Sequence, residues 1–291
     1  LELKKKTGAV ILAHNYVDGD IQDVADYCGD SLELSIKARD AKAKLMICCG
    51  VRFMAETAKL LSPESTVILP NSDAGCPMAD MATPETVDAM RKERPDAVFV
   101  AYVNTTAATK AKVDICCTSG NAEKVLRSIP EDKEIVFLPD RNLGCNMCRK
   151  LGREMVLWDG CCPVHDRVTL KDVEHSRSLH PGAIVIVHPE CRPEVVDEVY
   201  ASLSTAGILK FVRESRAPGF IIGTEQGILH RMKKFRDKKI YPLEPEIVCE
   251  DMKKITLEDV MEALLGNREE IVLDPELMKD AVRPIERMLA L

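Results

Sequence analysis

Three cysteines recur along the chain at nearly equal intervals. Cys76, Cys162 and Cys249 are 86 and 87 residues apart. Each follows a short apolar run that predicts a buried strand, so each is expected in a loop at the carboxyl end of that strand. A cysteine that recurs at the period of a whole folding unit indicates three thiolates that converge on one point. Three thiolates without a fourth protein ligand can hold an iron–sulfur cube and leave one iron open for chemistry.

Cys145 competes with Cys162 for the second of these positions. The string LPDRNLGC (residues 138–145) has the same spacing as LPNSDAGC (residues 69–76), so internal symmetry nominates Cys145. Cys145 and Cys148 also form a C-x-x-C pair, which fits a zinc half-site or a redox pair. Cys161 adjoins Cys162 and adds a further thiol. Symmetry and spacing alone leave the choice between Cys145 and Cys162 open.

Polar side chains close three long apolar runs, residues 8–16, 97–104 and 183–190. The side chains are His14, Asn15 and Tyr16 in the first run, Tyr102 and Asn104 in the second, and His188 and Glu190 in the third. Titratable groups directly after a buried parallel strand are typical of a crevice at the carboxyl edge of a sheet. A single histidine in such a place is more often structural, but three equivalent positions favour a shared site.

Hydroxyl residues precede three helix-like stretches and include Ser31, Ser119 and Thr205. The simplest interpretation is that they cap the helices by accepting hydrogen bonds from free backbone N–H groups. The same helix ends can also bind carboxylate or phosphate. Several of them facing one centre would suit a substrate with more than one anionic group. No phosphate-binding loop of the nucleotide-binding types is present, so a nucleotide is not indicated.

The elements that must position these residues follow a repeat. Apolar strands alternate with amphipathic helices, which predicts an α/β fold with short parallel sheets covered on both faces. We expect three similar α/β units whose carboxyl edges face a shared centre, with residues 44–50, 113–119 and 200–205 as equivalent second strands. The expected units are residues 1–80, 81–166 and 167–250. Residues 251–291, with helices and a short strand at 269–274, are expected to complete the first unit.

The composition narrows the class of protein. The chain has 291 residues, of which 46% are hydrophobic and 30% charged, and its net charge is −7. An acidic chain argues against a nucleic-acid surface, and no apolar run is long enough for a membrane span. Twelve cysteines are many for a chain with no visible signal peptide. Disulfides are disfavoured in the cytoplasm, the expected location, so metal binding or redox chemistry gains weight.

Many strings of the chain together resemble the quinolinate synthase family, which makes a precursor of NAD. They span residues 9–254 and include AHNY, GDSLELSIKA, GCPMAD, YVNT, CTSGNA, CPVH, VHPEC and VCEDMKK. The resemblance implies three similar three-layer α/β/α units with short parallel sheets around a pseudo-threefold centre. It also implies a [4Fe-4S] cluster held by Cys76, Cys162 and Cys249. In the family pattern Cys145 has no ligand role, so the resemblance favours Cys162 as the second ligand.

The resemblance also implies an activity. The family condenses iminoaspartate (iminosuccinate) with dihydroxyacetone phosphate, and the products are quinolinate, phosphate and water. The open iron acts as a Lewis acid, and an aspartate oxidase or dehydrogenase must supply the unstable imine. The implied substrate-binding residues are His14, Ser31, Tyr102, Asn104, Ser119, His188, Glu190 and Thr205, and the implied catalytic residues are Tyr16, Tyr102, His188 and Glu190. Ala206 stands where the family commonly has glycine.

Two other functions remain compatible with the sequence. One is a different [4Fe-4S]-dependent hydro-lyase on the same scaffold, which the Lewis-acid argument alone also supports. The other is a redox-sensing or metal-storage protein that uses Cys145, Cys148, Cys161 and Cys162. Substrate tests distinguish the hydro-lyase from a quinolinate synthase. Replacement of single cysteines distinguishes the redox-sensing or metal-storage protein from both.

Overall fold

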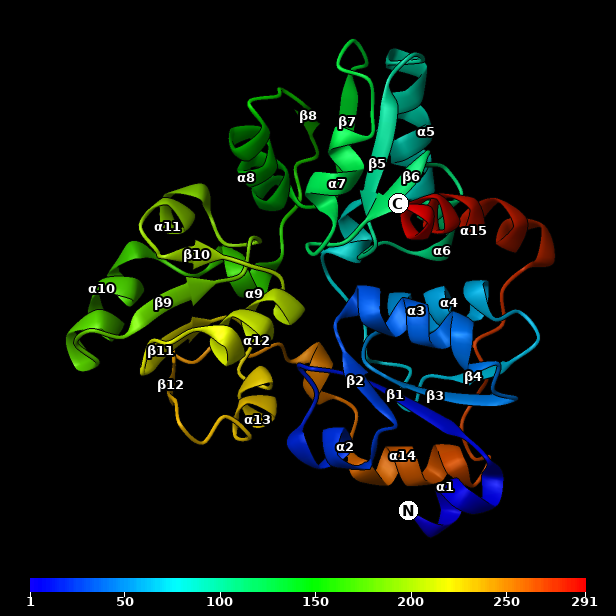
Figure 1. Ribbon diagram of the computed structural model, residues 1–291. Helices are drawn as coiled ribbons and strands as arrows, with labels where there is room; N and C mark the ends of the chain where they lie inside the picture. The colour runs from blue at the N-terminus through cyan, green and yellow to red at the C-terminus, as the bar shows by residue number, and fades with distance from the viewer.

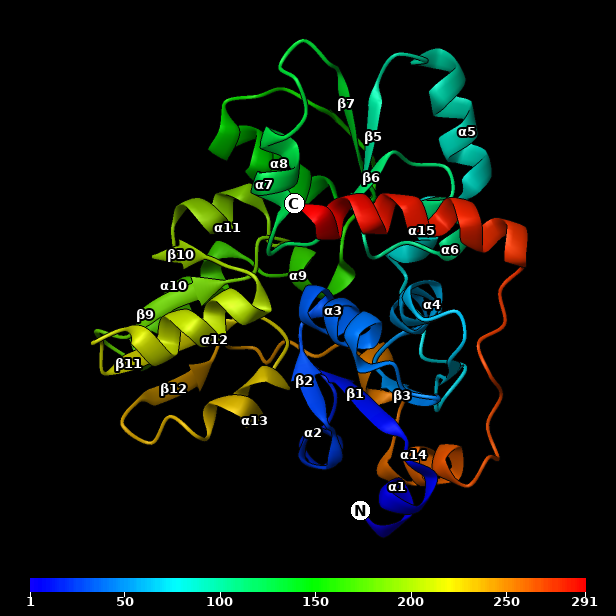
Figure 2. The same ribbon diagram turned by 45° about the vertical axis from the view of Figure 1, so that its right-hand side comes forward.

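Three four-stranded parallel sheets make up the molecule, and helices cover them (Figure 1). The computed structural model describes residues 1–291. Each sheet has the same strand order, in which the first strand of the unit lies between the second and the third and the fourth lies at an edge. The prediction of an α/β fold made of three similar units is confirmed. The three sheets surround a common centre, which Figure 2 shows from a second direction.

The first unit contains strands β1 to β4 and helices on both faces of the sheet. Residues 11–13 of β1 are almost fully buried, as expected for a central parallel strand covered on both sides. Its elements are α1 (Glu2–Thr7), β1 (Val10–His14), α2 (Gly19–Val24), β2 (Tyr27–Gly29), α3 (Ser31–Ala41), β3 (Leu45–Cys49), α4 (Arg52–Leu61) and β4 (Thr66–Ile68).

The second and third units repeat this arrangement after the short 3-10 helix η1 (Ala79–Met81). The second contains α5 (Pro84–Glu93), β5 (Val98–Tyr102), α6 (Ala107–Lys110), β6 (Ile115–Cys117), α7 (Ala122–Arg127), β7 (Ile135–Leu138), α8 (Arg141–Leu151), β8 (Val156–Leu157) and α9 (Pro163–Asp166). The third contains α10 (Leu170–Leu179), β9 (Ile184–Val187), α11 (Pro193–Asp197), β10 (Ala201–Ser202), α12 (Thr205–Glu214), β11 (Gly219–Gly223), α13 (Ile228–Met232) and β12 (Lys239–Pro242).

The structure corrects the predicted equivalence of the second strands. Residues 113–119 and 200–205 contain β6 and β10, which lie at the sheet edge that β2 occupies in the first unit. The strand at 44–50 is β3, whose counterparts are β7 and β11. The sequence analysis also overlooked β2, which has only three residues.

This correction bears directly on Cys145. The leucine–proline pair at 69–70 follows β4, the fourth strand of its sheet, whereas the pair at 138–139 follows β7, a third strand. The two strings are therefore similar in letters but not equivalent in the fold. Cys145 lies within α8, whereas Cys76, Cys162 and Cys249 follow β4, β8 and β12, which hold the same place in the three sheets.

The segment after residue 250 is shared between two units. After the 3-10 helix η2 (Asp251–Lys253), α14 (Leu257–Leu264) packs against α1, α2 and β3. The expected strand at 269–274 is reduced to a single antiparallel bridge between Ile68 and Glu270. The final helix, α15 (Pro275–Ala290), packs on β6 and α6 and touches α4. It therefore joins the second unit to the first, and the exact unit boundaries stay a prediction.

Apolar packing also links the units. One continuous core runs through the first two units and includes Ile186, Phe220 and Ile222 of the third sheet. A separate small core, with Val185 and Ile221 on the opposite face of that sheet, fills the outer side of the third unit. Every helix falls short of the length and apolar character that a membrane crossing requires.

Candidate active site

A cavity of about 360 Å³ lies where the carboxyl ends of the three sheets meet. Every residue that the resemblance implied as a ligand, substrate-binding or catalytic residue lines it, whereas Asn15 does not. From the first unit these are His14, Tyr16, Ser31 and Cys76; from the second, Tyr102, Asn104, Ser119 and Cys162; and from the third, His188, Glu190, Thr205 and Cys249. Their individual roles stay predictions, but the structure brings the whole set together.

The three cysteines form one group inside the cavity. Cys162 and Cys249 are both neighbours of Cys76. Burial raises the pKa of the Cys76 thiol to about 12 and also raises that of Cys162 well above its usual value. Such thiols stay protonated unless a metal ion replaces the proton. Cys145 and Cys161 do not line the cavity.

Glu190 is the centre of the polar groups in the cavity. Its side chain is 4% exposed, and Oε2 lies 2.7 Å from Nδ1 of His165 and 3.6 Å from Nδ1 of His188. Tyr102 also lies close enough to the carboxylate to favour its charged form. Burial alone would raise the pKa of Glu190, but His188, His165 and Tyr102 outweigh it and hold this pKa below its usual range. Glu190 is therefore a carboxylate at neutral pH.

A directed series of hydrogen bonds connects Tyr16 to this carboxylate. The Thr205 hydroxyl donates to the Tyr16 oxygen (3.0 Å), and Tyr16 lies 2.6 Å from the Thr224 hydroxyl. Thr224 in turn lies 2.9 Å from Nε2 of His165, whose Nδ1 faces Glu190. Each hydroxyl has a single proton, so the pattern is consistent if Tyr16 donates to Thr224, Thr224 to His165, and His165 to Glu190. A proton can move along such a series.

Two further histidines are neutral donors. Burial lowers the pKa of both His14 and His188 to about 3. Nδ1 of His14 accepts a hydrogen bond from the backbone N–H of Tyr16 (3.2 Å), and Nδ1 of His188 accepts one from that of Glu190 (3.4 Å). The proton of each neutral ring therefore sits on Nε2. In His188 this nitrogen lies 3.2 Å from the Ser119 hydroxyl.

The capping interpretation is correct for Ser204 but not for Ser31, Ser119 and Thr205. Asp30 caps α3 by accepting from the N–H groups of residues 32 and 33, and Ser204 caps α12. Ser31 and Thr205 follow these caps as the first helical residues. Ser119 precedes the start of α7 at residue 122 and lies in a turn. The three hydroxyls are thus free to face the cavity, where Ser31 makes no protein hydrogen bond with its side chain.

Several residues in or beside the cavity escaped the sequence analysis. His165, in the quoted string CPVH, and Glu225 line the cavity, whereas Thr224 and Lys253 lie behind its wall. Lys253, in VCEDMKK, binds the backbone carbonyl of Tyr16 (2.5 Å) and the buried carboxylate of Glu225 (3.1 Å). The loop after Cys249 is thereby tied to the end of the first sheet. Arg167 is the only lysine or arginine that lines the cavity.

Two donor sets for a metal therefore coexist in the cavity. Cys162, His165 and Glu190 offer ligand atoms within 4.8 Å of one another, a combination that zinc accepts. The other set is the three cysteines. In the first set Nδ1 of His165 faces both Glu190 and Cys162, at 2.7 and 3.3 Å, so one ring nitrogen would have to serve the metal and both neighbours. The three cysteines have no such conflict.

Three equivalent α/β units around one cavity of thiols, imidazoles and a carboxylate define a protein of the three-unit α/β class with a candidate metal site. The model of the family described as quinolinate synthetase A protein matches residues 1–290. The chain belongs to this family. It is 49% identical to the quinolinate synthase of Methanoregula boonei, over 100% of this chain and 96% of that protein. It is 48% identical to that of Desulforudis audaxviator (100% and 96%) and 46% identical to that of Caldicellulosiruptor bescii (99% and 95%).

Proposed function

We propose that the chain is a quinolinate synthase that condenses iminoaspartate with dihydroxyacetone phosphate and releases quinolinate, phosphate and water. The observation that carries the proposal is the meeting of three equivalent cysteines with Glu190 and its partners in one cavity. The full-length similarity to quinolinate synthases of three organisms supports it.

Cys76, Cys162 and Cys249 would hold a [4Fe-4S] cluster. Their donor chemistry fits, because three thiols meet and no fourth cysteine lines the cavity. When bound, such a cluster supplies Lewis-acid chemistry at the iron that no cysteine holds. Twelve free cysteines agree with a reducing compartment such as the cytoplasm.

The residues of the chain would bind and orient two anionic substrates. Nε2 of His14 and Nε2 of His188 are N–H donors suited to carboxylate and carbonyl oxygens. The hydroxyls of Ser31 and Ser119 offer further donors at other points of the wall, and that of Thr205, which donates to Tyr16, offers an acceptor. Oδ1 of Asn104 is buried and has no partner in the protein, so a substrate N–H or O–H would satisfy it.

Proton transfer would centre on Glu190. As a carboxylate, its oxygens can take a proton from a substrate carbon or nitrogen during tautomerisation. Tyr102 can return a proton to the departing oxygen, since burial raises its pKa and keeps it protonated. Tyr16, at the far end of the hydrogen-bond series, can supply a proton through Thr224 and His165.

Anaerobic reconstitution with iron and sulfide tests the proposal. The reconstituted protein is expected to contain four irons per chain if the cluster is a cube, and to form quinolinate from iminoaspartate generated in the assay and dihydroxyacetone phosphate. A reconstituted protein that forms no quinolinate would refute the proposal. Turnover of a simple hydroxy acid, with none of dihydroxyacetone phosphate, would favour another cluster-dependent hydro-lyase.

A further inference from the structure

Lys110 is a lysine with no exposed surface. It is the last residue of α6, its relative exposure is 0%, and it is among the largest fully buried side chains of the molecule. It does not line the cavity. Burial of an amine costs free energy unless its N–H groups make hydrogen bonds. The hydrogen-bond partners of Lys110 therefore indicate its role.

Its partners are the two carbonyl groups on either side of Asn104. Nζ donates to the carbonyl oxygen of Val103 (2.7 Å) and to that of Thr105. The same Val103 oxygen accepts from the backbone N–H of Thr105 (2.8 Å), which closes a three-residue turn with Asn104 at its centre. Lys110 therefore holds the peptide group before Asn104 directly and fixes the far end of the turn at the Thr105 carbonyl. The peptide group after Asn104 is held in turn by the bond from the Thr105 N–H to the Val103 oxygen.

We propose that Lys110 is a positioning residue for Asn104: its bonds to the Val103 and Thr105 carbonyls fix the turn that aims the Asn104 amide into the cavity. The inference rests on the proposed function, in which Asn104 binds substrate. It extends that function to a residue that touches no substrate. Because Oδ1 of Asn104 has no protein partner, nothing at its own tip orients this oxygen. Its direction depends on the backbone that carries it.

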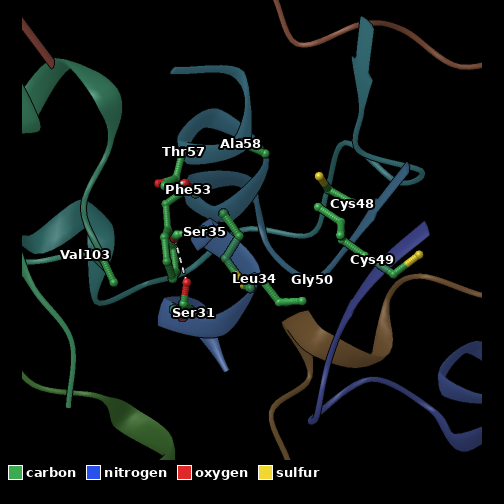
Figure 3. A pocket seen from close by; sticks show the side chains of 12 residues that line it. Ser31, Leu34, Ser35, Cys48, Cys49, Gly50, Phe53, Thr57, Ala58 and Val103 are labelled. Carbon is green, nitrogen blue, oxygen red and sulfur yellow. Dashed lines mark hydrogen bonds between the residues drawn. The ribbon is translucent and has the colours of Figure 1, made fainter. Parts of the chain in front are cut away.

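The first unit supports this arrangement through α4. The amine of Lys110 lies 5.5 Å from the ring centroid of Phe53, a cation–π distance. One turn further along α4, Oε2 of Glu56 accepts from the N–H of Ala107 (2.8 Å), the first residue of α6. Phe53 and Val103 both line a small void of about 20 Å³, and Figure 3 shows these two side chains among those that line it. Both ends of α6 thus rest on the neighbouring unit.

A double-mutant cycle tests the proposal. Lys110→Met keeps an unbranched side chain but removes the donors, and it is expected to lower kcat/KM about 100-fold, as a small misplacement of a binding group does. In the Asn104→Ala background the same change is expected to cost less than about threefold, because residues that act through one another are not additive. Lys112→Met is the matched control. Lys112 is two residues away and pairs with Asp88 at the surface. If the double mutant loses kcat/KM by the product of the two single-mutant losses, the proposal is overturned.

Hydrogen exchange supplies a readout that needs neither cluster nor turnover. Lys110→Met is expected to speed deuterium uptake in peptides that contain residues 103–106, with uptake in β5 unchanged, and Lys112→Met is expected to change neither. Unchanged uptake at 103–106 would overturn the proposal. If Lys110→Met does not fold, Lys110→Gln serves in the same comparisons. If the wild type makes no quinolinate, the proposed function fails, while the exchange comparison still decides whether Lys110 holds the turn.

Discussion

Tyr16 and Glu190 follow the first strands of different units, yet an unbroken series of hydrogen bonds joins them. The intermediate residues are Thr224, which follows β11, and His165, which lies in α9 after Cys162. The series therefore uses all three units. Its geometry lets a hydroxyl on one wall of the cavity exchange a proton with a carboxylate on another, without either group moving.

Thr224→Val interrupts this series with a side chain of the same shape. It removes the bond that Tyr16 donates and leaves Nε2 of His165 without a partner. We expect the free energy of unfolding to fall by about 1–3 kcal/mol and kcat to fall at least about tenfold. Urea denaturation and steady-state kinetics measure the two effects. Thr57→Val is a matched control, since the Thr57 hydroxyl bonds only the Phe53 carbonyl within α4; an equal loss of kcat there would argue against a relay.

Glu190→Gln keeps the size of the side chain but removes its charge. The cluster content should not change, because the proposed ligands are untouched, whereas kcat should fall by about 10²–10⁴-fold if the carboxylate transfers a proton. Iron and sulfide analysis and single-turnover kinetics provide the measurements. Near-normal turnover would exclude an essential proton-transfer role for Glu190.

Serine replacement of the cysteines separates the proposed cluster ligands from other thiols. Cys76→Ser, Cys162→Ser and Cys249→Ser are each expected to lose the cluster, as judged by iron, sulfide and visible absorption after reconstitution. Cys145→Ser is the control and should keep it. If Cys145→Ser loses the cluster while Cys249→Ser retains it, the redox-sensing alternative becomes the better account.

Arg167→Gln tests how the cavity attracts anions. Arg167 is exposed, and its guanidinium reaches the carbonyls of Glu246 and Val248 only weakly, at 3.4 Å each. Loss of the only lysine or arginine lining the cavity should raise the KM for dihydroxyacetone phosphate about tenfold, with kcat little changed, since one charged contact is worth about 1.5–3 kcal/mol. Arg213→Gln makes the same change of net charge far from the cavity and should leave KM unaltered.

Acid stability should depend on Asp166, which joins the second unit to the third. Its carboxylate pairs with Arg192 (3.0 Å), which holds the pKa of Asp166 below its usual range. A lowered folded-state pKa contributes stability above the unfolded value of about 3.9, and this is lost as the pH falls through the folded value. Asp166→Asn should therefore lower the urea midpoint of the cluster-free protein at pH 7, and the difference from wild type should shrink below about pH 4. A constant difference would contradict this.

The first strands and their polar ends could be predicted from the sequence because a covered parallel strand leaves a plain signal. The apolar runs before His14, Asn104 and Glu190 are long and end in polar or titratable side chains. The residues that lie between these ends, such as Thr224, give no such signal. Thr224 also follows an apolar strand, but a lone threonine after a strand is unremarkable until a tyrosine from another unit is seen beside it.

The equivalence of the second strands was wrong for a specific reason. β3 and β6 share the letters Ile-Cys-Cys, at 47–49 and 115–117. Strand order depends on which edge of the first strand each one joins, and the crossover helices decide that edge. Local letters do not carry this information. The same error made Cys145 resemble a counterpart of Cys76.

Helix α15 determines when the site can form during synthesis. It is made after all twelve strands, yet it packs on β6 and on α6, which contains Lys110. In a nascent chain that has completed the three sheets, β6 and α6 are still not packed against α15. We therefore expect the Asn104 turn to reach its final geometry, and the site to accept its cluster, only after α15 has left the ribosome.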